Sequence, residues 1–302
     1  MGTPATPQLD PNAAKWLAKA KPSVIRDFLT LFIPASLLLL ALIAGYHYAD
    51  NRRAQEAIFA AERGRIALAE QTLNTEMDNT IADLRILGRN NALKQALDDP
   101  DNADSRSPLI RIFSDHIEEI GNFDYIALLN AMNKELVRVK GTTGTPVTDD
   151  SFSSPSLGEQ AFVRDLLDTP PKTIRISRPL LDTDATSKQH FWPTLLFGMA
   201  VSGKNPDNKG ALLISYPIAT LTIQLDSLFV GAAGHVSVLN SNGHWLYDQV
   251  RQEDEWGNMF KGNRNFASIR PNIWQKIQAA ATGQVADDSG NFFQDLGSKQ
   301  ST

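Results

Sequence analysis

Side chains that could catalyse a reaction or hold a metal are scattered along this chain without a recognisable spacing. None of the five histidines forms an HExxH or similar metal-binding pattern: His47, His116, His190, His235 and His244. The chain has no cysteine, which excludes disulfides, zinc–thiolate sites, iron–sulfur clusters and cysteine nucleophiles. It also lacks the GxSxG, GxxxxGK[ST] and GxGxxG motifs. We therefore expect no enzyme active site, no metal and no cofactor.

Charge patterning gives no alternative chemistry. The acidic pairs, residues 98–99, 149–150 and 287–288, lie in turn-rich stretches, where solvated surface is the ordinary explanation. The formal net charge is -5, and no basic stripe carries interleaved aromatic residues, so nucleic acid is not an expected partner. With 42% hydrophobic residues, the chain has enough apolar mass to fold.

Residues 28–49 carry no formally charged side chain and have a leucine-rich centre. At ~1.5 Å per residue they span about 33 Å as a helix, enough to cross a hydrocarbon core of ~30 Å. Asp27 and Asp50 bound the segment, and Tyr46 and Tyr48 occupy the place of an interfacial aromatic belt. The segment predicts a transmembrane helix.

Two alternatives are a cleavable signal peptide and a buried core helix. A signal peptide has a shorter apolar region and an A-x-A-like exit, and a core helix needs apolar neighbours, which the flanking segments do not offer. Basic residues are nearly balanced on the two sides, so orientation rests on size. A short tail of residues 1–27 stays in the cytoplasm more easily than the large remainder, which we therefore place in the periplasm of a bacterial inner-membrane protein.

The stretch from residue 52 to residue 97 contains no proline and has apolar residues at near-heptad spacing. These are Phe59, Ile66, Leu73, Met77, Ile81, Leu84 and Leu87. One long stalk helix is predicted. Its apolar stripe meets a partner copy, giving a homodimer, or packs on its own domain, an alternative that applies most to the distal part.

Beyond the stalk, the pattern predicts helices and antiparallel strands. Residues 98–108 are a turn-rich break, and a helix is expected over 109–120, with a hairpin over 125–139. A second helix begins near Ser156, the predicted N-cap, with Glu159 at the capping-box position, and stops at the double proline by residue 171. Three strands follow, over residues 172–181, 195–202 and 211–218.

A second copy of this order is predicted after a connecting segment over 219–233. Residues 235–247 form a hairpin with Asn-Gly at the turn, and VLNSNG parallels the earlier LLNAMNK. A helix over 268–283 ends at Gly283 as its C-cap, and GNFF begins one more strand. The closing strands of the first copy have no counterpart, so we expect the second copy to be incomplete.

Several stretches together resemble the double Cache (PDC, PAS-like) sensor regions of bacterial receptors. They are NKELVRV, FGMAVS, KGALLISYPIATL, GHVSVLNSNGHWLY, EDEWGNMF and NFASIRPNIWQKIQ. The resemblance covers roughly residues 53–293. It implies an α+β fold with a cytoplasmic tail (1–27), a transmembrane helix (28–49), a stalk helix (50–97), a membrane-distal module with its connector (98–233) and a partial membrane-proximal module (234–302).

By the same resemblance, the ligand pocket lies against the sheet of the first module. The side chains it suggests are Arg138, Arg178, Trp192 and Tyr216. An arginine in a half-apolar pocket suits a small carboxylate, which it binds through two parallel hydrogen bonds. In the alternative interpretation, the arginines are solvated strand residues and the aromatic residues belong to the core. The RxWY-type string of the amino-acid-binding subgroup is absent, so amino acids are not favoured.

The function predicted is the ligand-sensing input of a membrane receptor, in which a small molecule shifts the stalk helix. In the family such regions drive diguanylate cyclases, histidine kinases or chemoreceptors through a second membrane helix. No second span or output domain is found in this sequence, so a truncated receptor or a fragment is expected. A membrane-tethered adaptor without a small ligand is the alternative, and a metal-independent enzyme is a more remote one.

Overall fold

The computed structural model describes residues 22–141, 147–148, 157–181, 193–232, 234–257, 259, 264–279, 282–285 and 291–294. Contacts divide the chain into two compact units, Met1–Ala61 and Glu62–Thr302. The predicted N-terminal tail up to residue 21 lies outside the described residues.

Helix α2, Pro22–Gly88, contains the predicted transmembrane segment. Residues 25–50 are all exposed, as expected of side chains that face lipid. In the described part of the chain this is the one helix long and apolar enough to cross a membrane, judged by length and composition. Pro34 lies inside it.

The stalk helix is shorter than the sequence predicts. Helix α2 ends at Gly88, and a separate helix α3, Asn91–Asp98, follows, with the Asn90 side chain accepting a hydrogen bond from the Ala92 amide as its N-cap. A Cβ on Gly88 would overlap the end of the Met199 side chain, so that side chain lies directly against the end of the helix. The turn-rich break is also shorter than expected, because Asn102 caps helix α4, Ala103–Ile120.

A sheet of seven antiparallel strands forms the centre of the second unit, in the order β3-β2-β1-β7-β6-β4, with β5 also pairing with β6. Its strands are β1 (Tyr125–Asn130), β2 (Glu135–Lys140), β3 (Val147–Thr148), β4 (Ile174–Ile176), β5 (Leu180–Leu181), β6 (Pro193–Ser202) and β7 (Lys209–Pro217). Helix α5, Leu157–Leu167, falls between β3 and β4. The predicted hairpins and helix are confirmed, while the expected N-cap, Ser156, lies outside the described residues. The single strand expected over 172–181 is two short strands.

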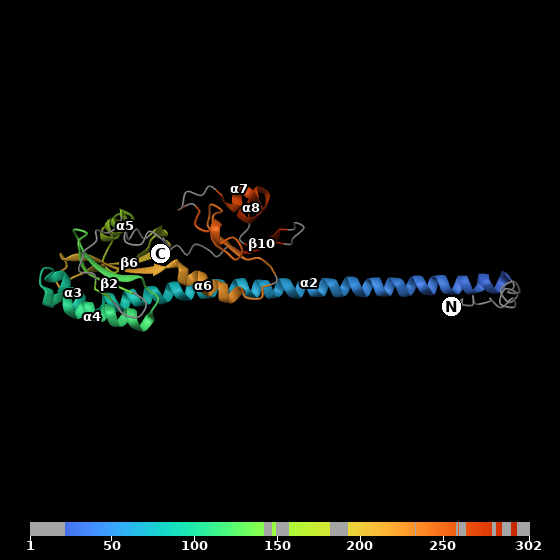
Figure 1. Cartoon of the computed structure of the whole chain (residues 1–302), viewed down its shortest axis with the longest axis horizontal. Coiled ribbons are helices and arrows are strands. Elements are labelled where there is room, and N and C mark those ends of the chain that lie inside the picture. Colours follow the sequence, from blue (N-terminus) through green and yellow to red (C-terminus); the bar gives the residue numbers. More distant parts are fainter. Residues whose placement is uncertain are drawn as a thin grey trace, which may run out of the picture. The chain divides into compact units, whose positions relative to one another are not determined.

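The two faces of the sheet are covered differently (Figure 1). One face packs against the end of α2 and against α3 and α4, in a core that includes Leu84, Leu93, Phe113 and Ile214. The other packs against α5, with Val163 and Leu166 over Leu213. The distal apolar stripe of the stalk therefore serves its own domain.

The segment expected to be a plain connector is helix α6, Ile218–Phe229. Hairpin β8 (Ser237–Leu239) and β9 (Trp245–Asp248) follows, with a tight turn at Gly243, where φ is 78°. A short 3-10 helix, Gln252–Asp254, comes next.

The helix predicted over 268–283 is wrong in its extent. It divides into α7 (Phe266–Ile269) and α8 (Pro271–Gln278), because proline disfavours helical backbone at the residue before it. Gly283 is no C-cap, since it lies in strand β10 (Thr282–Val285), which pairs with β11 (Asn291–Gln294). Strand β11 confirms the strand expected at GNFF.

Candidate functional site

The face of the sheet beneath α5 carries a buried cluster of charged side chains. From β2, the Arg138 Nε donates to both carboxylate oxygens of Glu135 at 3.1 Å. Its Nη2 contacts Glu135 and also lies 3.3 Å from Oε1 of Glu159 on α5. The guanidinium carbon lies 3.9 Å from the centroid of the Tyr125 ring, and the Tyr125 hydroxyl donates to Glu159. These four residues are called the Arg138 cluster below.

Burial makes the cluster unusual. The side chains of Arg138, Glu135 and Glu159 are 9%, 2% and 13% exposed. Burial lowers the pKa of Arg138, but Tyr125 and the two carboxylates raise it by more, so the net pKa shift is upward and the guanidinium stays charged. Buried charges persist only when paired, because their desolvation is costly.

A β-bulge places Glu135 and Arg138 on the same face. Residues three apart on a regular strand point to opposite faces. The register shifts between Leu128 and Leu129, so that Leu128 opposes Val137 and Leu129 opposes Glu135, which leaves Leu136 as an extra residue on β2. The bulge thus brings an acid and a base three positions apart into contact beneath α5.

Helix α5 lies close to the sheet at Gly198 of β6. A Cβ there would lie 2.6 Å from Leu166 Cδ2 and 2.7 Å from Phe162 Cε1, both on α5. Glycine at this position therefore leaves room for the Leu166 and Phe162 side chains of α5 to pack directly on the sheet.

The other site residues suggested by the sequence lie elsewhere. Arg178 is exposed, in the link between β4 and β5, where the Ser177 hydroxyl donates to its carbonyl. Trp192 lies outside the described residues. Tyr216 is fully buried on β7, but on the face opposite Arg138, where it packs with Phe123 and Phe197. A pocket on one face of the sheet would thus contain Arg138 or Tyr216, but not both.

Tyr216 takes part in a junction of three elements. Its hydroxyl donates to Oε2 of Glu76 on α2 at 3.2 Å, and Gln224 of α6 donates to Oε1 of the same carboxylate at 3.2 Å. Burial raises the pKa of Tyr216, and the Glu76 carboxylate raises it further, so the phenol remains a donor. Glu76 therefore ties the sheet and α6 to α2.

Polar groups of the second hairpin gather on Asp248. His235 Nε2 and Ser237 Oγ each lie 2.7 Å from its carboxylate, which also accepts from the amides of Val250 and Arg251. Burial raises the pKa of Asp248, but these hydrogen bonds lower it by more. A nucleophilic triad needs an imidazole bonded to the hydroxyl, whereas both groups here point at the acid, an arrangement that anchors the hairpin.

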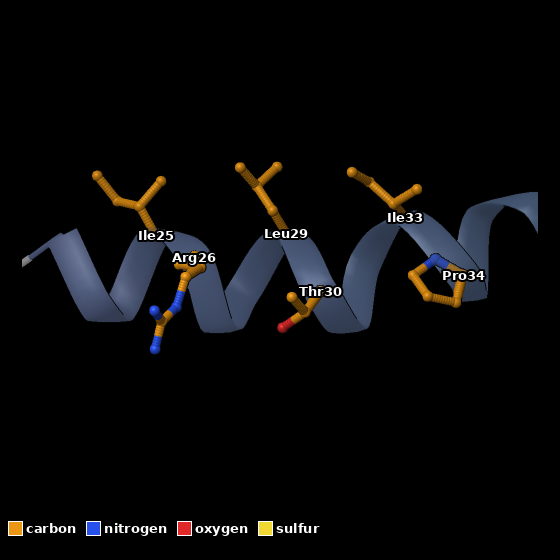
Figure 2. Close-up of a pocket in the computed structure, with 6 residues that line it drawn as sticks. All are labelled: Ile25, Arg26, Leu29, Thr30, Ile33 and Pro34. Atoms are coloured by element: carbon orange, nitrogen blue, oxygen red, sulfur yellow. The ribbon is translucent and has the colours of Figure 1, made fainter.

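Among the described residues, neither a metal site nor the hollow along α2 competes with the Arg138 cluster. Within the described ranges, no three His, Asp or Glu side chains gather as metal ligands. Figure 2 shows the side chains around a hollow along α2 itself, in the exposed apolar part of the helix. Its lining residues are Ile25, Arg26, Leu29, Thr30, Ile33 and Pro34. With side chains of one helix alone around it, this hollow offers no converging polar groups.

Sequence reasoning missed Tyr125, Glu135 and Glu159 as members of the site. Glu159 was expected at a capping-box position, and no local pattern indicates that it reaches Arg138 across 21 residues. The only sequence signal for Glu135 was its place beside Arg138 in the NKELVRV stretch. Glu76 and Gln224, which flank Tyr216, carried no signal beyond helical spacing.

Comparison with known proteins supports the fold. No family model matches the chain, and no curated protein matches it in sequence. A domain of a sensory box/GGDEF family protein from Vibrio parahaemolyticus is 19% identical, with a TM-score of 0.63 over 78% of this chain and 86% of that one. The extracellular domain of a protein described as a histidine kinase is 17% identical, with a TM-score of 0.61 over 73% and 80% of the two chains.

The isoleucine-bound sensory domain of the Campylobacter jejuni chemoreceptor Tlp3 is 10% identical, with a TM-score of 0.51 over 74% of this chain and 81% of that one. At such identities the likeness concerns the fold. The chain has the α+β fold of receptor sensory domains, joined to an apolar N-terminal helix, and the prediction of a Cache-type sensory fold is confirmed at that level.

Proposed function

We propose that this chain is the ligand-sensing, extracytoplasmic part of a single-pass membrane receptor. One observation carries the proposal. A region with the fold of receptor sensory domains follows, in the same chain, the one described helix apolar enough to cross a membrane. The N-terminal tail then lies in the cytoplasm and the sheet-containing unit in the periplasm of a bacterial inner-membrane protein.

Topology can be tested directly because the natural chain has no cysteine. Met132, at the turn between β1 and β2, is 82% exposed, so a single Met132→Cys variant offers an accessible thiol. A membrane-impermeant maleimide added to intact spheroplasts is expected to label it. Labelling only after lysis would place the domain in the cytoplasm and contradict the proposal.

The ligand is a small molecule, and its site is the α5 face of the sheet around Arg138. Helices α2, α3, α4 and α6 contribute apolar side chains to the core on the opposite face, whereas α5 is the one described helix over the Arg138 cluster. A paired and buried arginine is an expensive way to fill a core, and its planar fork is suited to a carboxylate. Arg178 and Trp192 remain proposed contacts for the same ligand.

Signal transfer is proposed to run through the Glu76 junction. Tyr216 belongs to β7, which crosses the middle of the sheet, and it is bonded to α2 through Glu76. A ligand that shifts the sheet relative to α2 would change this contact and so move the helix that enters the membrane. A homodimer joined along the membrane-proximal part of α2 completes the proposed receptor.

A thermal-shift screen of the full chain in lipid nanodiscs tests ligand binding. The compounds are organic acids, amino acids, polyamines and nucleobases. A ligand present at 100 times its Kd raises the free energy of unfolding by about 2.7 kcal/mol. For a domain of this size, that raises the Tm by roughly 5–10 °C. Arg138→Gln should abolish the shift, whereas Arg175→Gln, at an exposed position of β4, should preserve it. No shift from any compound would refute the sensor and favour a membrane-tethered adaptor.

A further inference from the structure

The Arg138 cluster is already complete without a ligand. Arg138 meets two carboxylates, one from its own strand and one from α5, and its side chain is 9% exposed. An additional anion at this place would add a third negative group around one guanidinium. It can bind without adding buried negative charge only by exchanging with one of the two glutamates.

The two glutamates differ in exposure and in the element that carries them. Glu135 bonds to Arg138 through both carboxylate oxygens and is 2% exposed, and it is fixed three residues away on the same strand. Glu159 reaches Arg138 at 3.3 Å from a separate helix, accepts a hydrogen bond from the Tyr125 hydroxyl, and is the more exposed of the two at 13%. Glu159 is therefore the carboxylate that can leave, and α5 is the element that would move with it.

We infer that the Glu159 carboxylate occupies the place of the ligand's own carboxylate. Resting on the proposed function, this assigns the ligand to the organic carboxylates, which compete with Glu159 for the Arg138 fork and the Tyr125 hydroxyl. Exchange breaks the contacts that Glu159 of α5 makes with Arg138 and Tyr125. It leaves the ion pair between Arg138 and Glu135 intact. Release of α5 from the sheet is then the first structural event of sensing.

The exchange also predicts how affinity is set. A ligand must displace a charge-assisted hydrogen bond before it gains its own. Removing the charge of Glu159 should thus tighten carboxylate binding, which is the opposite of what loss of an ordinary ligand contact does. That opposite sign separates an internal competitor from a binding residue.

The test compares the full natural chain in nanodiscs with Glu159→Gln and with Asp165→Asn. Asp165 is exposed on the same helix, so its variant makes the same charge change away from Arg138. Acetate, succinate and citrate are titrated at constant ionic strength, with putrescine as a cation. Glu159→Gln should bind at least one carboxylate about tenfold or more tighter than the natural chain, and Asp165→Asn should match the natural chain.

Hydrogen exchange gives a second measurement, and Glu159→Asp a second variant if Glu159→Gln folds poorly. The shorter aspartate keeps the charge but retreats from Arg138, so an intermediate gain in affinity is expected. The amides of α5 should exchange faster in Glu159→Gln and, in the natural chain, on saturation with the carboxylate. Unchanged or weaker carboxylate binding by both variants would overturn the inference.

The two proposals can fail separately. Suppose that the natural chain binds putrescine or a neutral compound, but Glu159→Gln shows no higher affinity for carboxylates. The inference that Glu159 competes with the ligand is then overturned, and the proposed sensor function stands. If neither the natural chain nor either Glu159 variant binds any compound, the sensor proposal falls as well.

Discussion

Tyr216→Phe is the substitution that most directly tests the junction between the sheet and α2. It removes one hydroxyl and keeps the ring, so the edge contacts with Phe123 and Phe197, both at 6.3 Å between centroids, persist. What is lost is the hydrogen bond to Glu76 at 3.2 Å. Hydrogen bonds to charged groups contribute about 1.5–3 kcal/mol. Since Gln224 still donates to the same carboxylate, we expect a loss near the lower end.

The assay is thermal unfolding of the full chain in nanodiscs, followed by tryptophan fluorescence. A loss of about 1.5–2 kcal/mol lowers the Tm by roughly 3–8 °C for a domain of this size. Tyr46→Phe, at a 70% exposed position, is the matched control and should leave the Tm unchanged.

A double-mutant cycle with Glu76→Gln separates this bond from general loosening. If Tyr216 and Glu76 act together, the double variant should lose less than the sum of the two single variants, by about 0.5–2 kcal/mol. Additive losses, or a Tyr216→Phe variant as stable as the natural chain, would refute the idea that this hydrogen bond holds α2 to the sheet.

Three further tests address other parts of the structure. Gly198→Ala places a methyl group against Leu166, so it should lower the free energy of unfolding by about 1–3 kcal/mol and speed hydrogen exchange in α5. Unchanged exchange would contradict the close approach of α5 to the sheet there. The pKa of Asp98 is lowered, because hydrogen bonds from the Asn208 side chain and from the 204 and 205 amides outweigh the effect of burial. The ionised Asp98 therefore stabilises the fold above about pH 4, and this stabilisation is lost as pH falls through the lowered pKa. Asp98→Asn should thus lose stability at pH 7 and flatten the acid dependence below pH 4, measured by unfolding at each pH. For the proposed dimer along α2, Phe59→Cys should form a disulfide between two copies when membranes are oxidised. Ala61→Cys, on the opposite side of α2, should not. Equal cross-linking of both variants would argue against a dimer contact on the Phe59 side.

Local patterns were sufficient for the long apolar helix and for most of the strands. A charge-free apolar run has one stable form in lipid, and the Asn-Gly turn with its flanking apolar residues favours a hairpin whatever surrounds it. Boundaries failed where a single residue decided them: Asn90 starts α3, and Pro271 divides α7 from α8. These are capping and steric effects that periodicity does not contain.

The composition of the candidate site depended on contacts that no local pattern encodes. The β-bulge at Leu136 sets Glu135 beside Arg138, and α5 brings Glu159 to the same guanidinium from another part of the chain. The alternation of β7 turns Tyr216 to the other face, toward Glu76.

By itself, the sequence determined that this chain has a lipid-compatible helix, lacks thiol chemistry and follows the helix and strand order of a sensory fold, because composition and period act within a few residues. The tertiary structure alone decided which face of the sheet each polar side chain occupies and which partner neutralises it. Strand register and helix docking join residues far apart in the chain, and a shift of one position reverses the face on which a side chain lies.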